Sequence, residues 1–162
     1  METNNYSPQG LFAGDAIAER SPRVVIGPHR YIQGEGVLDQ LGRYISVLNS
    51  RKPALLITEG GMKRVGDRIL QSLSESVHKT INLFFDGECS DKEVERILGQ
   101  LKNKSIDSVI AVGGGKCIDT AKCIAHCMSV PVVVCPTLAS TDAPCSAVSV
   151  MYTPEGVFAP TD

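Results

Sequence analysis

Three consecutive glycines followed by a lysine form the feature of this sequence best suited to chemistry. Gly113, Gly114 and Gly115 stand between an apolar run and a helical pattern, with Lys116 at the start of that pattern. Glycine permits left-handed backbone conformations and the close approach of a ligand. The free amides at a helix start point at one spot, where the helix dipole also favours an anion. The spacing matches neither a Walker A loop nor the GxGxxG fingerprint. It favours a pyrophosphate, with a tight turn that binds nothing as the competing interpretation.

A second run, rich in hydroxyl groups, follows the next apolar stretch. It extends from Pro136 to Ser146 and contains Thr137, Ser140 and the carboxylate of Asp142. In open α/β sheets, ligands bind beyond the carboxyl ends of the strands, where this loop is expected to lie. The hydroxyls can equally satisfy the backbone of their own loop, so binding and structural roles remain open on the loop alone.

The elements that must position these loops alternate along the chain. Short, continuously apolar runs predict strands, and segments of 3.6-residue period between them predict helices. Ser90 is expected to cap one helix, with Glu93 at its third position. The predicted strands are Arg23–Ile26, Ala54–Thr58, Ile81–Phe85, Ser108–Val112 and Val132–Cys135, and the predicted helices include Gly36–Leu48, a segment after Gly61 and Lys116–Met128.

This alternation is typical of a Rossmann-like α/β fold, a parallel sheet with helices on both faces. The last stretch, Ala147–Asp162, alternates and then contains a turn signal, so it predicts a C-terminal β-hairpin. We expect residues 1–20 to be a flexible leader and residues 21–162 to form one dinucleotide-binding domain.

Composition excludes several classes of function. The chain has 162 residues, a formal net charge of −2, 5% aromatic residues and no tryptophan, which argues against nucleic-acid binding. There is no apolar run of the ~20 residues that a membrane span needs and no secretory signal pattern, so a cytoplasmic location is expected. The six cysteines form no CxxC pair, which favours buried reduced thiols over a disulfide scaffold or a zinc site.

Both loops together identify a family resemblance. The glycine run with Asp119–Lys122, the loop Pro136–Pro144 and the following Ser146–Tyr152 closely resemble the glycerol dehydrogenases of the iron-type, or group III, alcohol dehydrogenase family. Further matches are Ser21-Pro22, Tyr31–Gly34, Gly87–Ser90 and Ala125–Val132, so the resemblance runs from about Ser21 to Phe158.

The resemblance implies an NAD-linked oxidation of glycerol, or a related small polyol, to dihydroxyacetone. It implies that Asp142 contacts the polyol, and that the glycine run holds the pyrophosphate while later residues line the nicotinamide side. The cofactor-binding residues that it implies are Thr58, Gly113, Gly114, Gly115, Lys116, Cys117, Asp119, Thr137, Ser140, Ser146, Val148 and Tyr152.

Two departures from the family pattern stand out. Thr58, followed by Glu59, occupies the position where relatives place an Asp that binds the adenosine ribose, so the preference for NAD over NADP stays open. Intact relatives hold zinc with one Asp and two His from a helical C-terminal domain, which this sequence lacks. His29, His78 and His126 are too far apart in sequence to replace that set, so we expect no catalytic residue and no metal ligand here.

Three functions are therefore compatible with the sequence. The first is the nucleotide-binding half of a glycerol dehydrogenase, present as a truncated product and inactive alone. The second is a non-catalytic subunit or pseudo-enzyme that keeps the fold and associates with a full-length relative. A homo-oligomer is the other association expected of the chain. The third is another phosphate-binding enzyme such as the dehydroquinate synthase branch, against which the run Ser140–Pro144 argues.

Overall fold

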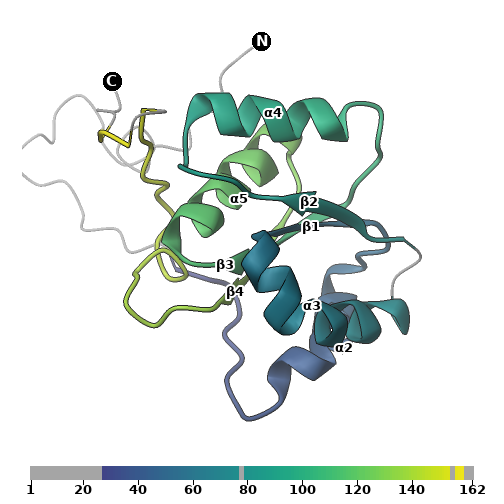
Figure 1. Cartoon of the computed structure of the whole chain (residues 1–162). Coiled ribbons are helices and arrows are strands. Elements are labelled where there is room, and N and C mark those ends of the chain that lie inside the picture. The colour runs from purple at the N-terminus through teal and green to yellow at the C-terminus, as the bar shows by residue number, and fades with distance from the viewer. Residues whose placement is uncertain (1–26, 77–78, 154–155, 159–162) are drawn as a thin grey trace, which may run out of the picture.

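Four parallel strands form the centre of the molecule, with helices between them (Figure 1). The computed structural model describes residues 27–76, 79–153 and 156–158. The predicted leader, the predicted strand Arg23–Ile26 and His78 lie outside these residues. The elements in chain order are the 3-10 helix η1 (Val37–Gln40), α2 (Leu41–Ile45), the 3-10 helix η2 (Ser46–Leu48), β1 (Pro53–Ile57), α3 (Glu59–Ser74), β2 (Ile81–Phe84), α4 (Asp91–Leu101), β3 (Ser108–Gly113), α5 (Gly115–Met128) and β4 (Val132–Pro136).

The sheet has the strand order β2-β1-β3-β4, and every neighbouring pair is parallel. Each strand predicted within the described residues is present to within a residue or so at its ends. All five residues of β1 and all six of β3 are buried, because helices cover both sides of these central strands. The predicted Rossmann-like α/β fold is confirmed.

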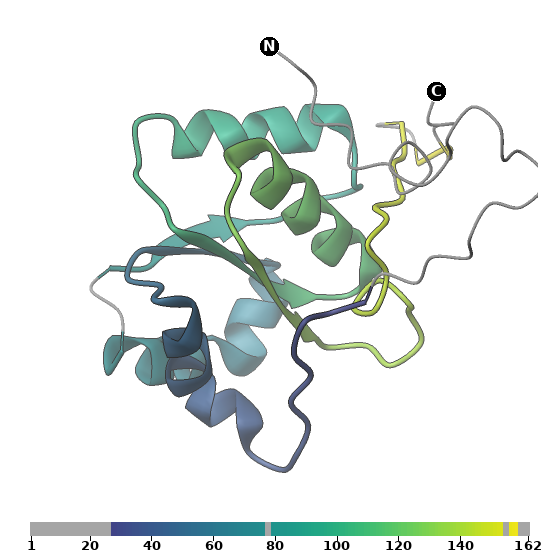
Figure 2. The same cartoon turned by 180° about the vertical axis from the view of Figure 1, so that it is seen from behind.

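Alternate side chains of each central strand pack into two separate cores. Leu55 and Ile57 of β1 pack with Ile69 and Leu73 of α3, on the face that also carries α2. Their neighbours Ala54 and Leu56 point to the other face, in the core formed with α4 and α5. Figures 1 and 2 show α4 and α5 together on one side of the sheet, and α2 and α3 on the opposite side. Residues along these strands are apolar at successive positions because each one faces one of the two helical layers.

The helix predicted over Gly36–Leu48 is interrupted. It divides into η1, α2 and η2. The amide of Gly42, in the first turn of α2, donates a 3.0 Å hydrogen bond to Ser72 Oγ on α3. A Cβ on Gly42 would lie 2.1 Å from the carbonyl oxygen of Ser72, so glycine is needed for this close approach.

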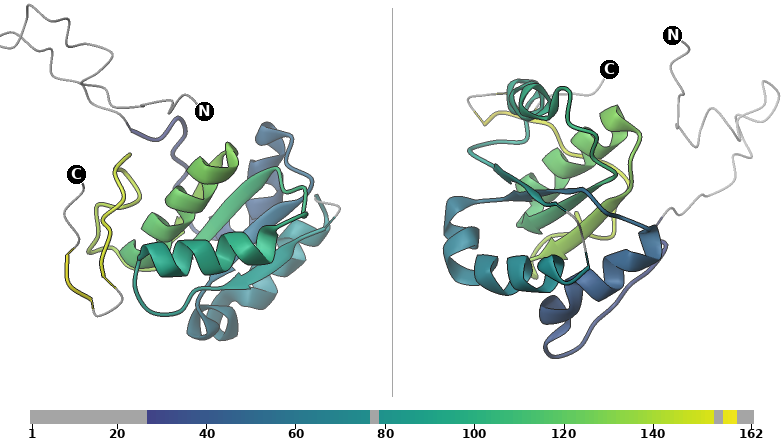
Figure 3. Two further views of the ribbon diagram at one scale, coloured as in Figure 1. Left: turned by 90° about the horizontal axis from the view of Figure 1, so that it is seen from above. Right: turned by 90° about the vertical axis from the view of Figure 1, so that its right-hand side faces the viewer.

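The predicted C-terminal hairpin is reduced to one antiparallel bridge between Tyr152 and Phe158 within the described residues. The segment instead lies beside the N-terminal ends of α5 and α4, as Figure 3 shows. The amide of Val150 donates to Asp119 Oδ2 at 3.2 Å, and that of Tyr152 donates to the Cys89 carbonyl at 2.7 Å. Because these amides bond to the domain, they are not available to a second strand.

In the described part of the chain, the helices are all too short or too polar to cross a membrane.

Candidate functional site

The carboxyl ends of three neighbouring strands meet at the edge where the chain reverses direction across the sheet. From β1 the chain continues to β2 on one side, and from β3 to β4 on the other. Ile57 pairs with Val112, and Gly113 pairs with Pro136, so Thr58, Gly114 and Thr137 leave adjacent strands at the same edge. Such a topological switch point is where open α/β sheets bind ligands.

The three glycines of the turn are required for different reasons. Their backbone is not left-handed, since positive φ angles occur at Gly36, Gly87 and Gly156 among the described glycines. A Cβ on Gly113 would lie 2.7 Å from Cys117 Cβ, and one on Gly115 would lie 2.7 Å from Thr141 Oγ1. Close packing therefore requires glycine at these two positions.

Gly114 has no such packing reason. A Cβ at this position would find no heavy atom within 4 Å, and the residue begins α5 with an extended backbone (φ −86°, ψ −175°). The first amides of α5 have no intrahelical acceptor and carry the positive end of the helix dipole. Open space next to these donors fits the pyrophosphate of a dinucleotide.

Lys116 in the first turn of α5 is engaged by a carboxylate. Its ammonium lies 2.5 Å from Glu88 Oε1 and 5.6 Å from the centre of the Tyr152 ring. The lysine side chain is half exposed, whereas that of Glu88 is 22% exposed. The other oxygen of Glu88 is buried and has no hydrogen-bond partner among the residues that the structure describes. Glu88 therefore draws Lys116 toward the C-terminal segment.

Cys117 packs its side chain beneath Gly113 toward β1, and Asp119 directs its carboxylate to Lys122. Cys117 is buried, its Sγ lies 3.7 Å from the Leu56 carbonyl of β1, and burial raises the pKa of its thiol to about 12. Asp119 is 6% exposed and accepts from Lys122 Nζ at 2.9 Å. The group of Cys117 that a cofactor can contact is therefore its backbone amide.

Asp119 and Lys122 instead attach the segment that carries Val148 to α5. Lys122 Nζ also donates to the Val148 carbonyl at 2.8 Å, and Ser149 Oγ donates to the Asp119 carbonyl at 3.1 Å. With the Val150 amide on the carboxylate, three contacts fix residues 148–150. Asp119 is a positioning residue for the side of the site that the resemblance gives to nicotinamide.

We expect Asp119→Ala to detach this segment. The substitution removes the acceptor of the Val150 amide and leaves Lys122, which is 12% exposed, without its counter-charge. A loss of about 2–3 kcal/mol in unfolding free energy is expected for such a pair. Hydrogen exchange at the amides of residues 149–152 should accelerate, while the exposed control Asp67→Ala leaves it unchanged. Equal exchange in both variants would contradict this role.

The hydroxyl-rich loop after β4 is mostly exposed and is held by its backbone. Thr137 donates its amide to the Gly113 carbonyl at 2.9 Å, which joins the two loops. Thr137, Ser140 and Asp142 have exposed side chains, and the Asp142 carbonyl accepts the amides of residues 145 and 146 in a turn. The carboxylate of Asp142 is thus open to a ligand while its backbone shapes the loop.

Sequence reasoning missed Thr141 as the contact between the two loops. Its Oγ1 faces Gly115 and accepts the amide of Ala143 at 3.2 Å. Ser146 and Val148 form a local turn in which Ser146 Oγ accepts the Val148 amide at 3.1 Å. This is the structural role that the hydroxyl-rich composition left open.

A groove of about 600 Å³ extends from the ends of β1 and β2. Thr58 lines it, and its hydroxyl caps α3 by accepting the Gly61 amide at 3.0 Å. Glu59 and Asp86 bring carboxylates to the groove, whereas the guanidinium of Arg96 lies 2.6 Å from Glu93 Oε2. The bonds between these two side chains raise the pKa of Arg96. The groove therefore presents the hydroxyl of Thr58 and the carboxylates of Glu59 and Asp86. Its arginine, Arg96, is already paired with Glu93.

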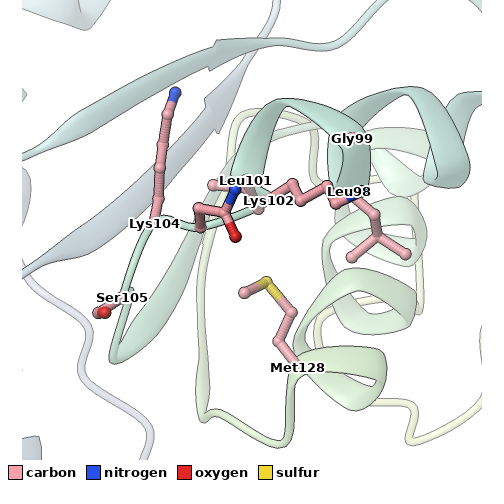
Figure 4. Close-up of a pocket in the computed structure, with 8 residues that line it drawn as sticks. Leu98, Gly99, Leu101, Lys102, Lys104, Ser105 and Met128 are labelled. Atoms are coloured by element: carbon pink, nitrogen blue, oxygen red, sulfur yellow. The ribbon is translucent and has the colours of Figure 1, made fainter.

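A second hollow lies at the opposite edge of the sheet, near the C-terminal ends of α4 and α5 (Figure 4). Leu98, Lys102 and Met128 are among its lining residues, and none of the predicted site residues lines it.

The described residues assemble no metal centre from His, Cys, Asp or Glu side chains. Within residues 27–76, 79–153 and 156–158, no three His, Cys, Asp or Glu side chains converge. His29 and His126 are exposed. Zinc needs three or four converging donors, so these residues do not fit it. Cys127 and Cys145 are exposed as well, which corrects the expectation of buried thiols at these two positions.

Comparison with known proteins agrees with this geometry. Residues 28–159 match the family described as iron-containing alcohol dehydrogenase. A glycerol dehydrogenase of Escherichia coli O6:H1 is 42% identical over 145 residues, which are 84% of this chain and 37% of that protein. One from Thermotoga maritima is 42% identical over 134 residues, covering 82% of this chain and 36% of that protein.

Solved structures give the same result. A probable glycerol dehydrogenase from Sinorhizobium meliloti superposes with a TM-score of 0.76 at 37% identity, over 86% of this chain and 37% of that one. Glycerol dehydrogenase from Schizosaccharomyces pombe gives a TM-score of 0.77 at 34% identity, over 85% and 35% of the two chains. The chain thus spans little more than a third of the length of these relatives. The chain belongs to the iron-containing alcohol dehydrogenase family.

Proposed function

We propose that this chain is the nucleotide-binding part of a glycerol dehydrogenase-type oxidoreductase and that it binds NAD. The observation that carries the proposal is the open space beside Gly114, at a helix N-terminus and at the switch point of the sheet. Packing explains the other two glycines of the turn but not this one.

Different residues of the site bind the two ends of a dinucleotide. NAD, when bound, accepts a hydride from the alcohol. The amides of Gly115, Lys116 and Cys117 bind its pyrophosphate. The groove beside Thr58 and Glu59 takes the adenosine end, and the segment with Val148 and Tyr152, held by Asp119, takes the nicotinamide end.

The groove also predicts which dinucleotide is preferred. Glu59 can accept hydrogen bonds from ribose hydroxyls, whereas a 2′-phosphate would face Glu59 and Asp86, with Arg96 paired to Glu93. Calorimetry on the purified chain should show weak NAD binding and a dissociation constant for NADP at least roughly tenfold higher. Glu59→Gln should bring the dissociation constants for NAD and NADP closer together. Equal binding of both would contradict the ribose assignment, and binding of neither would overturn the proposed function.

Asp142 is expected to recognise the polyol and not to stabilise the fold. Its exposed carboxylate can accept hydrogen bonds from two adjacent hydroxyls. In a protein completed with the remaining domain of a relative, Asp142→Asn should raise the KM for glycerol and lower kcat, together roughly tenfold or more in kcat/KM. The control Asp67→Asn should change neither. A lower melting temperature with unchanged kinetics would make Asp142 a structural residue.

The same edge of the domain supports association with further protein. Leu138 is 56% exposed, Val148 67%, Val157 63% and Phe158 60%. Exposed apolar residues gathered near one edge favour a covering partner. A second copy, a full-length relative or the remaining domain of the family would each bury them.

A further inference from the structure

Three sulfur atoms from three separate segments meet beside α5, and the proposed function uses none of them. Cys89 precedes α4, Cys123 lies on α5, and Met151 lies in the segment after β4. The Sδ atom of Met151 lies 3.4 Å from Cys89 Sγ and 3.6 Å from Cys123 Sγ.

The site is enclosed on one side and reachable on the other. Cys89 is fully buried, whereas Cys123 and Met151 are partly exposed. The position of Met151 is fixed by its neighbours, since the Tyr152 amide donates to the Cys89 carbonyl at 2.7 Å and the Val150 amide donates to Asp119. Three donors are therefore held together by contacts that do not involve sulfur.

The donor set selects a soft ion. Thiolate and thioether ligands favour Cu(I), whereas Zn²⁺ in structural sites takes four Cys or His donors, which the described residues do not offer here. We propose that Cys89, Cys123 and Met151 form a three-coordinate binding site for Cu(I).

Binding is an exchange of protons for metal, without oxidation. Two S–H bonds break, two Cu–thiolate bonds and one Cu–thioether bond form, and two protons pass to solvent. The resulting site carries one net negative charge and lies beside the ion pair between Lys122 and Asp119.

The test is an anaerobic Cu(I) competition titration against a chromophoric Cu(I) chelator. The reference protein carries Cys127→Ser and Cys145→Ser, which removes the two exposed thiols. We expect one tightly bound Cu(I) per chain and a raised melting temperature on binding. Met151→Leu, a substitution close in volume that keeps the apolar packing, should weaken binding at least roughly tenfold. X-ray absorption should show three sulfur neighbours around copper.

A matched control separates this site from general sulfur chemistry. Met128, also partly buried, lies at the other end of α5, so Met128→Leu should bind Cu(I) as the reference does. Cys123→Ser should abolish tight binding. Equal affinity in the reference and in Met151→Leu would overturn the proposal, and so would an equal loss in Met128→Leu. These outcomes do not depend on NAD binding.

Discussion

Replacing Gly114 with valine is expected to raise the dissociation constant for NAD at least roughly a hundredfold and to leave the fold intact. Valine adopts the extended backbone of Gly114 without strain, and its Cβ meets no heavy atom of the domain within 4 Å. The side chain instead fills the space in front of the first amides of α5. A pyrophosphate then loses both the space and the donors.

Two further substitutions give this experiment its controls. Gly99 on α4 is exposed and also has open space at its Cβ position, so Gly99→Val should bind NAD normally. Gly113→Val should lower the melting temperature, because its Cβ would lie 2.7 Å from Cys117 Cβ. Calorimetry and thermal unfolding measure the two effects separately. If Gly114→Val bound NAD as tightly as the unmodified chain, the pyrophosphate assignment would be wrong.

The strands were predictable because their pattern is local. A run such as Ala54–Ile57 is apolar at every position, and only a sheet covered on both faces buries all of it. The start of α4 was predictable for the same reason, since the Glu93 amide donates to Ser90 Oγ at 3.3 Å. The Glu93 carboxylate, however, bonds to Arg96 and to the Asp86 amide, because both lie within its reach.

The common position of the two candidate loops was predictable, but their contacts were not. The glycine turn and the loop after β4 were located correctly at one edge, since parallel strands bring their carboxyl ends together. What each residue contacts depends on segments distant in sequence. The need for glycine at 115 comes from Thr141, and the partner of Lys116 is Glu88. No local pattern contains those pairs, and the cofactor contacts of these residues stay predictions.

We expect that the 162 residues of this chain alone do not oxidise glycerol, which is the largest effect predicted here. Hydride transfer from a secondary alcohol needs the hydroxyl proton to leave, and a divalent metal lowers that cost. Among the described residues no three His, Cys, Asp or Glu side chains converge as ligands for a divalent metal, and His29 and His126 are both exposed. Exposed apolar residues such as Leu138 and Val148 also leave the proposed site open to water, which weakens its electrostatic interactions.

An absorbance assay for NADH, with glycerol, NAD and added zinc, measures this directly. The purified chain should show a rate at least roughly a thousandfold below that of an intact relative. Joining it to the remaining residues of the Thermotoga maritima glycerol dehydrogenase, which is 42% identical over the shared part, should restore turnover. In that protein Gly114→Val should again remove activity, because the NAD site would come from this chain. If the chain alone turned over glycerol at a rate near that of the intact relative, this prediction would be wrong. Proton removal would then need only the residues of this chain.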